Sequence, residues 1–144
     1  MLATPPEALP QVPHSVLDTR GLPFRQAHEV IGKTVLYCIG ALYDVRLIGG
    51  VDEDFIYRAE AFHFGEVVLT SYRCGAQSFD RSRTRIGRDG LDHITLQFCV
   101  SGRHGPRDGG PEDQAGPGDM LIADLAHRQA TATSHSDSLN LTIP

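Results

Sequence analysis

Apolar and polar residues alternate between residues 93 and 100, and this segment organises the rest of the chain. The apolar positions are Ile94, Leu96, Phe98 and Val100, and the positions that separate them are His93, Thr95, Gln97 and Cys99. A period of two is that of a β-strand, whose successive side chains point to opposite faces of a sheet. One face can therefore pack on a core while the other meets a cavity or solvent. The alternation leaves open which face is inside.

A polar loop and the Gly-Pro-Gly-Asp turn at residues 116–119 lead from this strand to a second apolar run over residues 120–125. Proline presets φ at such a turn and glycine accepts the positive φ that follows, so the chain reverses. The two runs are predicted to form a long hairpin. The loop between them, residues 102–118, is rich in glycine and proline and poor in apolar residues, which predicts an exposed and mobile segment.

Other segments of the chain also have the composition of strands. Residues 55–64 and 66–74 are separated only by Gly65, which predicts a hairpin or sharp bend, and residues 43–48 predict a short strand. Residues 78–86 alternate as well, with Arg81, Arg83 and Arg85 on one side of a predicted strand. Residues 128–134 and 139–143 complete the series. Strands at this spacing, with turn residues between them, indicate a sandwich or barrel.

The N-terminal part has a different pattern. Five of the nine prolines fall in residues 1–23, which predicts an extended lead over residues 1–22. Pro23 suits the first turn of a helix, and an apolar stripe at helical spacing follows it. We expect one helix from about residue 23 to 38, and a single domain over residues 23–144.

Composition excludes some partners. The net charge of −5 makes the chain a poor electrostatic partner for DNA or for an anionic membrane surface. No apolar run approaches the roughly 20 residues of a membrane-spanning helix, and the first residues lack the features of a signal peptide. Three widely spaced cysteines, Cys38, Cys74 and Cys99, are expected to be free thiols in a reducing compartment. These features predict a cytoplasmic protein with no membrane partner.

Candidate binding residues lie on the predicted strands. His93 and Gln97 share one face and would be polar contacts for a ligand if that face lines a cavity, with Tyr72 as a third candidate. The arginines at residues 73–88 could receive a carboxylate or phosphate, which slightly favours an acidic ligand. They could equally be a solvated face paired with nearby aspartates. No nucleophile elbow or phosphate-binding glycine loop is present, so we expect no catalytic residue and no cofactor.

From about residue 24 onward, several features in order resemble the N-terminal sensor domain of AraC-type transcriptional regulators. These are the predicted helix, AFHFGEVVLTS at residues 61–71, the pair Arg83-Thr84, Asp92-His93 before an apolar strand, PGDMLIADLAH at residues 117–127, and LNLTIP at residues 139–144. The resemblance implies a mainly β fold, a cupin-like double-stranded β-barrel or jelly roll preceded by one N-terminal helix. It also implies a role for Arg83, either at a ligand or as a structural anchor.

The same resemblance implies a small-molecule effector held in the barrel, with Tyr72, Arg83, His93 and Gln97 as the candidate ligand-binding residues. DNA would be bound only through a C-terminal helix-turn-helix domain, which lies outside these residues together with the helices expected after Pro144. A homodimer of the full-length regulator is a further expected partner.

Two other classes remain open at this point, a cupin-like enzyme and a structural dimerisation module. Metal-dependent cupin enzymes resemble one another in a His-x-His motif and a later histidine after Pro-x-Gly. In this sequence His63 and His93 stand alone, and Met120 and Leu121 follow the Pro-Gly-Asp turn. A transition-metal site needs at least three such ligands around one ion, so no metal site is expected.

An acidic chain with no recognition helix in view is expected to lack specific DNA affinity. We expect residues 1–144 alone to give no sequence-dependent mobility shift at physiological salt. A shift that discriminates between DNA sequences and survives physiological salt would contradict this expectation.

Overall fold

The computed structural model describes residues 11–18, 42–48 and 57–144. Most elements of this part of the chain are β-strands, joined by one short α-helix and one 3-10 turn. The strands are β1 His14–Asp18, β2 Asp44–Leu47, β3 Tyr57–Phe64, β4 Val67–Cys74, β5 Gln77–Arg81, β6 Ile94–Ser101, β7 His104–Pro106, β8 Met120–Asp124, β9 Gln129–Thr133 and β10 Ser136–Ile143. The helices are α3 Arg83–Asp89 and η1 Pro111–Asp113.

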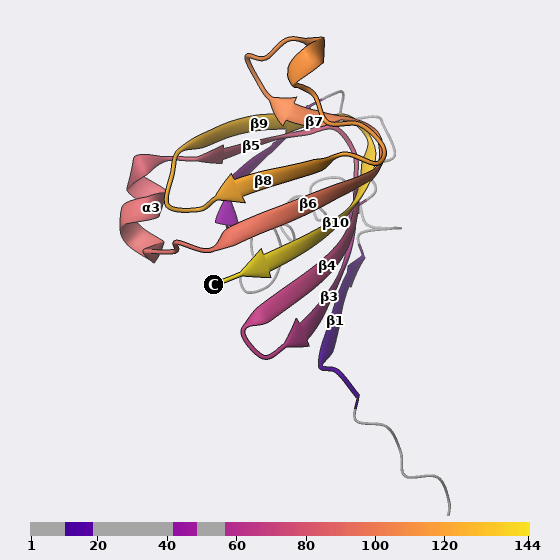
Figure 1. Ribbon diagram of the computed structural model, residues 1–144, viewed down its shortest axis with the longest axis vertical. Helices are drawn as coiled ribbons and strands as arrows, with labels where there is room; N and C mark the ends of the chain where they lie inside the picture. The colour runs from indigo at the N-terminus through magenta and orange to yellow at the C-terminus, as the bar shows by residue number, and fades with distance from the viewer. Residues whose placement is uncertain (1–10, 19–41, 49–56) are drawn as a thin grey trace, which may run out of the picture.

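The strands form two antiparallel sheets, and the predicted mainly β fold is confirmed. A six-stranded sheet has the order β1-β3-β4-β10-β6-β8, and a four-stranded sheet has the order β2-β5-β9-β7. Figure 1 shows the larger sheet curving from β8 to β1, with the smaller sheet behind its upper part and α3 at one edge. Among the described residues, no helix is long and apolar enough to cross a membrane.

Both predicted hairpins are present. β3 and β4 pair in one continuous register from Tyr57–Cys74 to Phe64–Val67, and β6 pairs with β8 from Ile94–Asp124 to Phe98–Met120. The short strand predicted at residues 43–48 is β2. Cys74 and Cys99 are buried free thiols. The helix predicted over residues 23–38 lies outside the described residues, as does Cys38.

The strand predicted over residues 78–86 is wrong in its second half. β5 ends at Arg81, and α3 begins two residues later. The Ser82 side chain caps this helix by accepting a hydrogen bond from the Arg85 amide, 3.2 Å away. Gly90 ends it in the left-handed region at φ 61°, and its amide donates to the Ile86 carbonyl. These caps outweigh an alternating pattern, so the three arginines do not share one strand face.

The loop predicted over residues 102–118 is not exposed throughout. β7 pairs with β9, and His104 and Ala115 exchange backbone hydrogen bonds of 3.0 and 2.8 Å. His104 is only 7% exposed. A Cβ atom on Gly105 would lie 2.8 Å from the Asp113 carbonyl oxygen, so only glycine lets the two sides of this loop approach so closely. Glycines that suggest disorder in the sequence therefore permit a folded loop.

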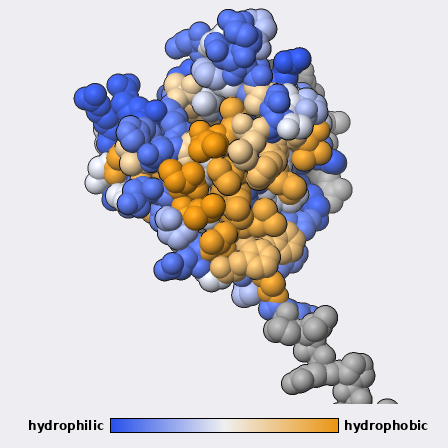
Figure 2. Space-filling model, in the orientation of Figure 1, coloured by the Kyte–Doolittle hydropathy of each residue, from blue (hydrophilic) through white to orange (hydrophobic). Residues whose placement is uncertain are grey.

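The six-stranded sheet has its apolar face outward. Phe98, Val100, Met120 and Ile122 are exposed, and Ile122 reaches 65%. Figure 2 shows a broad apolar area on the face of the large sheet, whose strands β6 and β8 carry these exposed residues. The interleaved positions of the same strands face inward instead. Side chains from both sheets and the loops between them form the buried core, which contains Tyr43, Ala59, Tyr72, Cys74, Phe79 and Leu125.

Arg81 joins separate parts of the fold at the end of β5, and its side chain is fully buried. Its Nε donates to the Leu125 carbonyl at 2.6 Å, and Nη1 donates to the Leu42 carbonyl at 3.0 Å. Its two terminal nitrogens also hold the Asp89 carboxylate in a bidentate pair of 2.7 and 2.8 Å. Hydrogen bonding to Arg81 lowers the pKa of Asp89. The pair therefore stabilises the fold above about pH 4 and is lost as the pH falls toward the lowered value.

Replacing Arg81 by methionine should lower the free energy of unfolding by about 3 kcal/mol or more, because buried carbonyls and a carboxylate lose their donor. Urea denaturation at pH 7 measures this change. Arg107→Met is the control, since Arg107 pairs with Asp80 on the surface and should have little effect. Equal effects of the two substitutions would show that the buried network has no special role.

Candidate functional site

A cavity of about 380 Å³ lies between the inner face of the six-stranded sheet and β5, β7 and β9 of the smaller sheet. This volume is in the range of small-molecule sites. Half of the polar side chains that line the cavity lie on β4, β6 and β10, adjacent strands of the larger sheet. One wall of the cavity is therefore formed by the inward positions of these strands.

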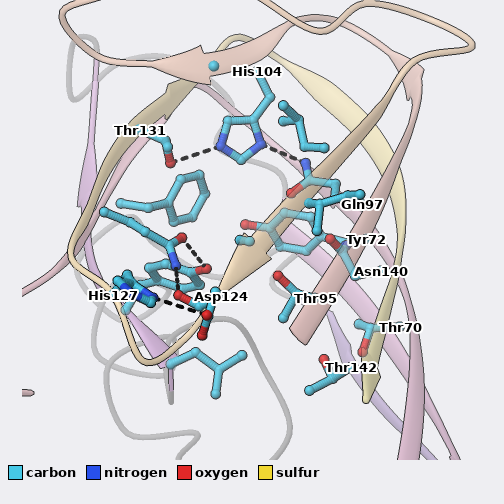
Figure 3. A pocket seen from close by; sticks show the side chains of 18 of the residues that line it. Thr70, Tyr72, Thr95, Gln97, His104, Asp124, His127, Thr131, Asn140 and Thr142 are labelled. Carbon is cyan, nitrogen blue, oxygen red and sulfur yellow. Dashed lines mark hydrogen bonds and ion pairs between the residues drawn. The ribbon is translucent and has the colours of Figure 1, made fainter. Parts of the chain in front are cut away.

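Strand register aligns these polar side chains in rows. Asn140 on β10 is opposite Thr70 on β4 and opposite Gln97 on β6. Two residues further along β10, at the next position on the same face, Thr142 is opposite Thr95 on β6. Residues directly opposite one another in a sheet have Cβ atoms roughly 5 Å apart, so these side chains form one continuous polar wall. Figure 3 shows this wall along one side of the cavity.

The remaining surface of the cavity is largely apolar. Phe79 from β5, Leu121 and Ala123 from β8, and Leu42 before β2 contribute to it. A molecule bound here would meet a row of hydroxyl and amide groups on one side, and a mainly apolar surface with polar groups at the two ends of the cavity elsewhere. This combination is typical of small-molecule sites, in which a few polar groups fix the orientation of the ligand.

His104 connects the two sheets across one end of the cavity. Its Nδ1 lies 2.6 Å from Gln97 Nε2, and its Nε2 lies 2.9 Å from Thr131 Oγ1 on β9. The ring also packs against Phe79, with centroids 5.4 Å apart. Burial lowers the pKa of His104 to about 4, so the ring is neutral at pH 7. In this arrangement the Gln97 amide donates a hydrogen bond to His104 Nδ1. The protonated Nε2 of His104 donates to the Thr131 hydroxyl.

A second set of hydrogen bonds lies at the more exposed end of the cavity. Tyr43 Oη donates to Gln129 Oε1 at 2.9 Å, and Gln129 Nε2 donates to the Asp124 carbonyl at 2.8 Å. The Asp124 carboxylate pairs with the exposed His127 ring at 3.0 Å. Burial raises the pKa of Tyr43, which keeps this phenol protonated as a donor.

The structure brings together two of the four predicted binding residues. Gln97 and Tyr72 both line the cavity. Tyr72 is buried, and its hydroxyl donates to Gln77 Oε1 at 3.2 Å. Arg83 is instead the exposed first residue of α3, and His93 precedes β6 with its Nδ1 3.9 Å from Asp92. Neither Arg83 nor His93 lines the cavity.

Sequence reasoning missed His104, Thr70, Asn140 and Thr142. The last two alternate with Leu139 and Leu141, so the period that singled out Gln97 also contained a signal for them. His104 carries no such signal, because it lies in a glycine-rich segment whose pairing depends on a distant strand. Among the described residues, no group of three or more His, Cys, Asp or Glu side chains could hold a metal ion.

Comparisons with known proteins give a shared fold and short sequence matches. No protein-family model matches this chain. The AraC-like transcriptional activator CuxR has a similar structure, with a TM-score of 0.76 and 18% sequence identity over 92% of this chain and 47% of that chain. Ectoine synthase from P. lautus is more distant, with a TM-score of 0.43 and 12% identity over 61% of this chain and 64% of that chain. The first likeness shows that this chain has the fold of part of an AraC-like activator.

The curated sequence relatives are argininosuccinate lyases. The protein from Acetivibrio thermocellus is 34% identical over 99 residues, which are 69% of this chain and 16% of that enzyme. The protein from Streptococcus thermophilus is 37% identical over 78 residues, 49% of this chain and 16% of the enzyme. The chain thus spans about one sixth of the length of these curated relatives.

The buried neutral His104 should make stability depend on pH. Because its pKa in the folded protein is about 4, below the roughly 6.5 of an unfolded histidine, the unfolded chain takes up the proton first. Stability is then full above about pH 6.5 and falls by about 3 kcal/mol as the pH drops toward 4. Urea titrations from pH 7.5 to 4.5 measure this loss.

The His104→Gln variant should be less stable at pH 7 but should lose much less stability on acidification. His127→Gln is the matched control, because His127 is exposed at the edge of the same cavity. If the His104 variant keeps the full decline between pH 6.5 and 4.5, another group is responsible for it.

Proposed function

We propose that this chain is the effector-sensing domain of an AraC-type transcriptional regulator. A small molecule would bind in the cavity and control a helix-turn-helix domain outside these 144 residues, through which the regulator would bind DNA in the cytoplasm. The observation that carries the proposal is the polar wall of β4, β6 and β10. It lines a cavity of ligand size in a fold shared with an AraC-like activator over 92% of this chain.

The position of the cavity suggests how a ligand would act. Gln97 belongs to the larger sheet, whereas His104 and Thr131 belong to the smaller one, and their hydrogen bonds cross between the two. A ligand that contacts both sheets would favour one arrangement of them over others. A ligand shifts an equilibrium only by its difference in affinity for the two states, and contacts across an interface supply such a difference.

We propose binding rather than catalysis for this cavity. Its walls are mainly amides, hydroxyls and apolar groups, and both ring nitrogens of His104 are engaged in hydrogen bonds. The carboxylate of Asp124 is paired with His127 at the exposed end. The matches to argininosuccinate lyases cover a sixth of those enzymes, and nothing in the cavity assigns their activity to this chain.

A ligand should stabilise the domain against heat, and substitutions in the polar wall should weaken this effect. At a hundredfold excess over Kd, the stabilisation is about 2.7 kcal/mol, which corresponds to a melting shift of several degrees. A thermal-shift screen against a metabolite library measures it. Thr70→Val and Thr142→Val keep the side-chain shape and remove one hydroxyl each, so each should weaken binding about 3- to 10-fold.

Ser71→Ala is the matched control, because Ser71 neighbours Thr70 in sequence but points to the opposite, exposed face of β4. Ala123→Phe should fill the cavity and remove the shift altogether. A shift that survives both Ala123→Phe and the two threonine substitutions would place the ligand elsewhere. A broad library that gives no shift at all would count against the sensing function.

A further inference from the structure

Resting on the proposed function, we infer that the effector is an uncharged molecule that donates hydrogen bonds to Gln97 and Asn140, such as a polyol or a primary carboxamide. Three features of the cavity lead to this class of ligand. They are the orientation of the two amide side chains, the absence of a cationic group from the described lining, and the apolar surface opposite the polar wall.

The first feature is the orientation of Gln97. The structure places its amide nitrogen, and not its oxygen, toward His104, and Figure 3 shows this contact at the end of the cavity. His104 accepts one of the two amide hydrogens, and the amide oxygen remains available to accept a hydrogen bond from a ligand. His104 thus acts as a positioning residue, which presents Gln97 to the cavity as a hydrogen-bond acceptor.

Asn140 repeats this arrangement on the neighbouring strand. Its Nδ2 donates to Ser138 Oγ at 3.1 Å, and its side chain is buried in the cavity wall directly opposite Gln97. Within the described part of the chain, neither amide oxygen has a hydrogen-bond partner. Two adjacent acceptors favour a ligand that carries N–H or O–H groups. The hydroxyls of Thr70 and Thr142 can donate as well as accept, so they fit the same ligand.

The described lining offers an anionic ligand no arginine or lysine. His104, which also lines the cavity, is neutral. The nearby arginines are engaged elsewhere: Arg81 with Asp89, Arg107 with Asp80, and Arg85 with Asp44 and the Tyr43 carbonyl. Burying a carboxylate or phosphate without a partner is costly, and two amide oxygens facing it would add repulsion. The arginines at residues 73–88, from which the sequence slightly favoured an acidic effector, therefore do not line this cavity.

The first test needs no ligand. In ¹⁵N-labelled protein at pH 7, long-range ¹H–¹⁵N NMR distinguishes which ring nitrogen of His104 carries the proton, and His104→Gln assigns the signals. We expect the proton on Nε2, because Nδ1 must accept from Gln97. A proton on Nδ1 would mean that the Gln97 oxygen faces His104 and its nitrogen faces the cavity, which overturns the inference.

The second test compares matched probes by thermal shift and calorimetry. Each set pairs a neutral molecule with acidic counterparts: D-glucose with D-gluconate and glucose 6-phosphate, nicotinamide with nicotinate, and inositol with inositol phosphate. Every hit of a metabolite screen is then compared with its own neutral or acidic counterpart in the same way. We expect each neutral binder to bind at least 10-fold more tightly than its acidic counterpart. Gln97→Met should weaken the neutral binder about 10-fold, whereas Ser71→Ala, on the exposed face of β4, should not.

The outcomes distinguish failure of the inferred ligand class from failure of the proposed sensing function. A carboxylate or phosphate that binds more tightly than its neutral counterpart would overturn the inference while supporting ligand sensing. Failure of every probe and every library compound would count against ligand sensing itself, and the NMR result would still decide which amide atoms face the cavity.

Discussion

The buried guanidinium of Arg81 is the contact on which the arrangement of the two sheets depends. Its donors meet the carbonyls of Leu125 and Leu42 and the carboxylate of Asp89, which lie on three separate segments. A buried cation is tolerated only when its hydrogen bonds are satisfied, so these segments must converge on one point. This convergence fixes the end of β5 against α3 and the segment that follows β8.

The cavity depends on a second polar connection, between His104 and Gln97. His104 thus links the two sheets by side-chain hydrogen bonds, and Arg81 links the segments that precede β2 and follow β8, in addition to the apolar contacts of the core. The cost of burying a histidine is offset because both ring nitrogens are paired. The same pairing orients the amide of Gln97. One interaction thus contributes to the fold and sets the chemistry of the cavity.

Several features could be predicted from the sequence because they are local. The hairpins at residues 57–74 and 94–124 follow from the alternation of apolar and polar residues and from turn residues between the strands. The strand predicted through residue 86 failed because two residues, Ser82 and Gly90, cap a helix within an alternating stretch. β7 was missed because its residues, His104–Pro106, show no alternation of apolar and polar side chains.

By itself, the sequence determined that β6 has an apolar face and a polar face, and that Gln97 lies on the polar one. Only the tertiary structure decided which face is inside. An alternating strand is equally compatible with both orientations, since a rotation of the strand exchanges its faces without changing its pattern. Here the polar face points inward, because the inward positions of β4 and β10 are polar too and the three strands form one wall. The site therefore arises from the pairing of distant strands, whose separate patterns do not specify it.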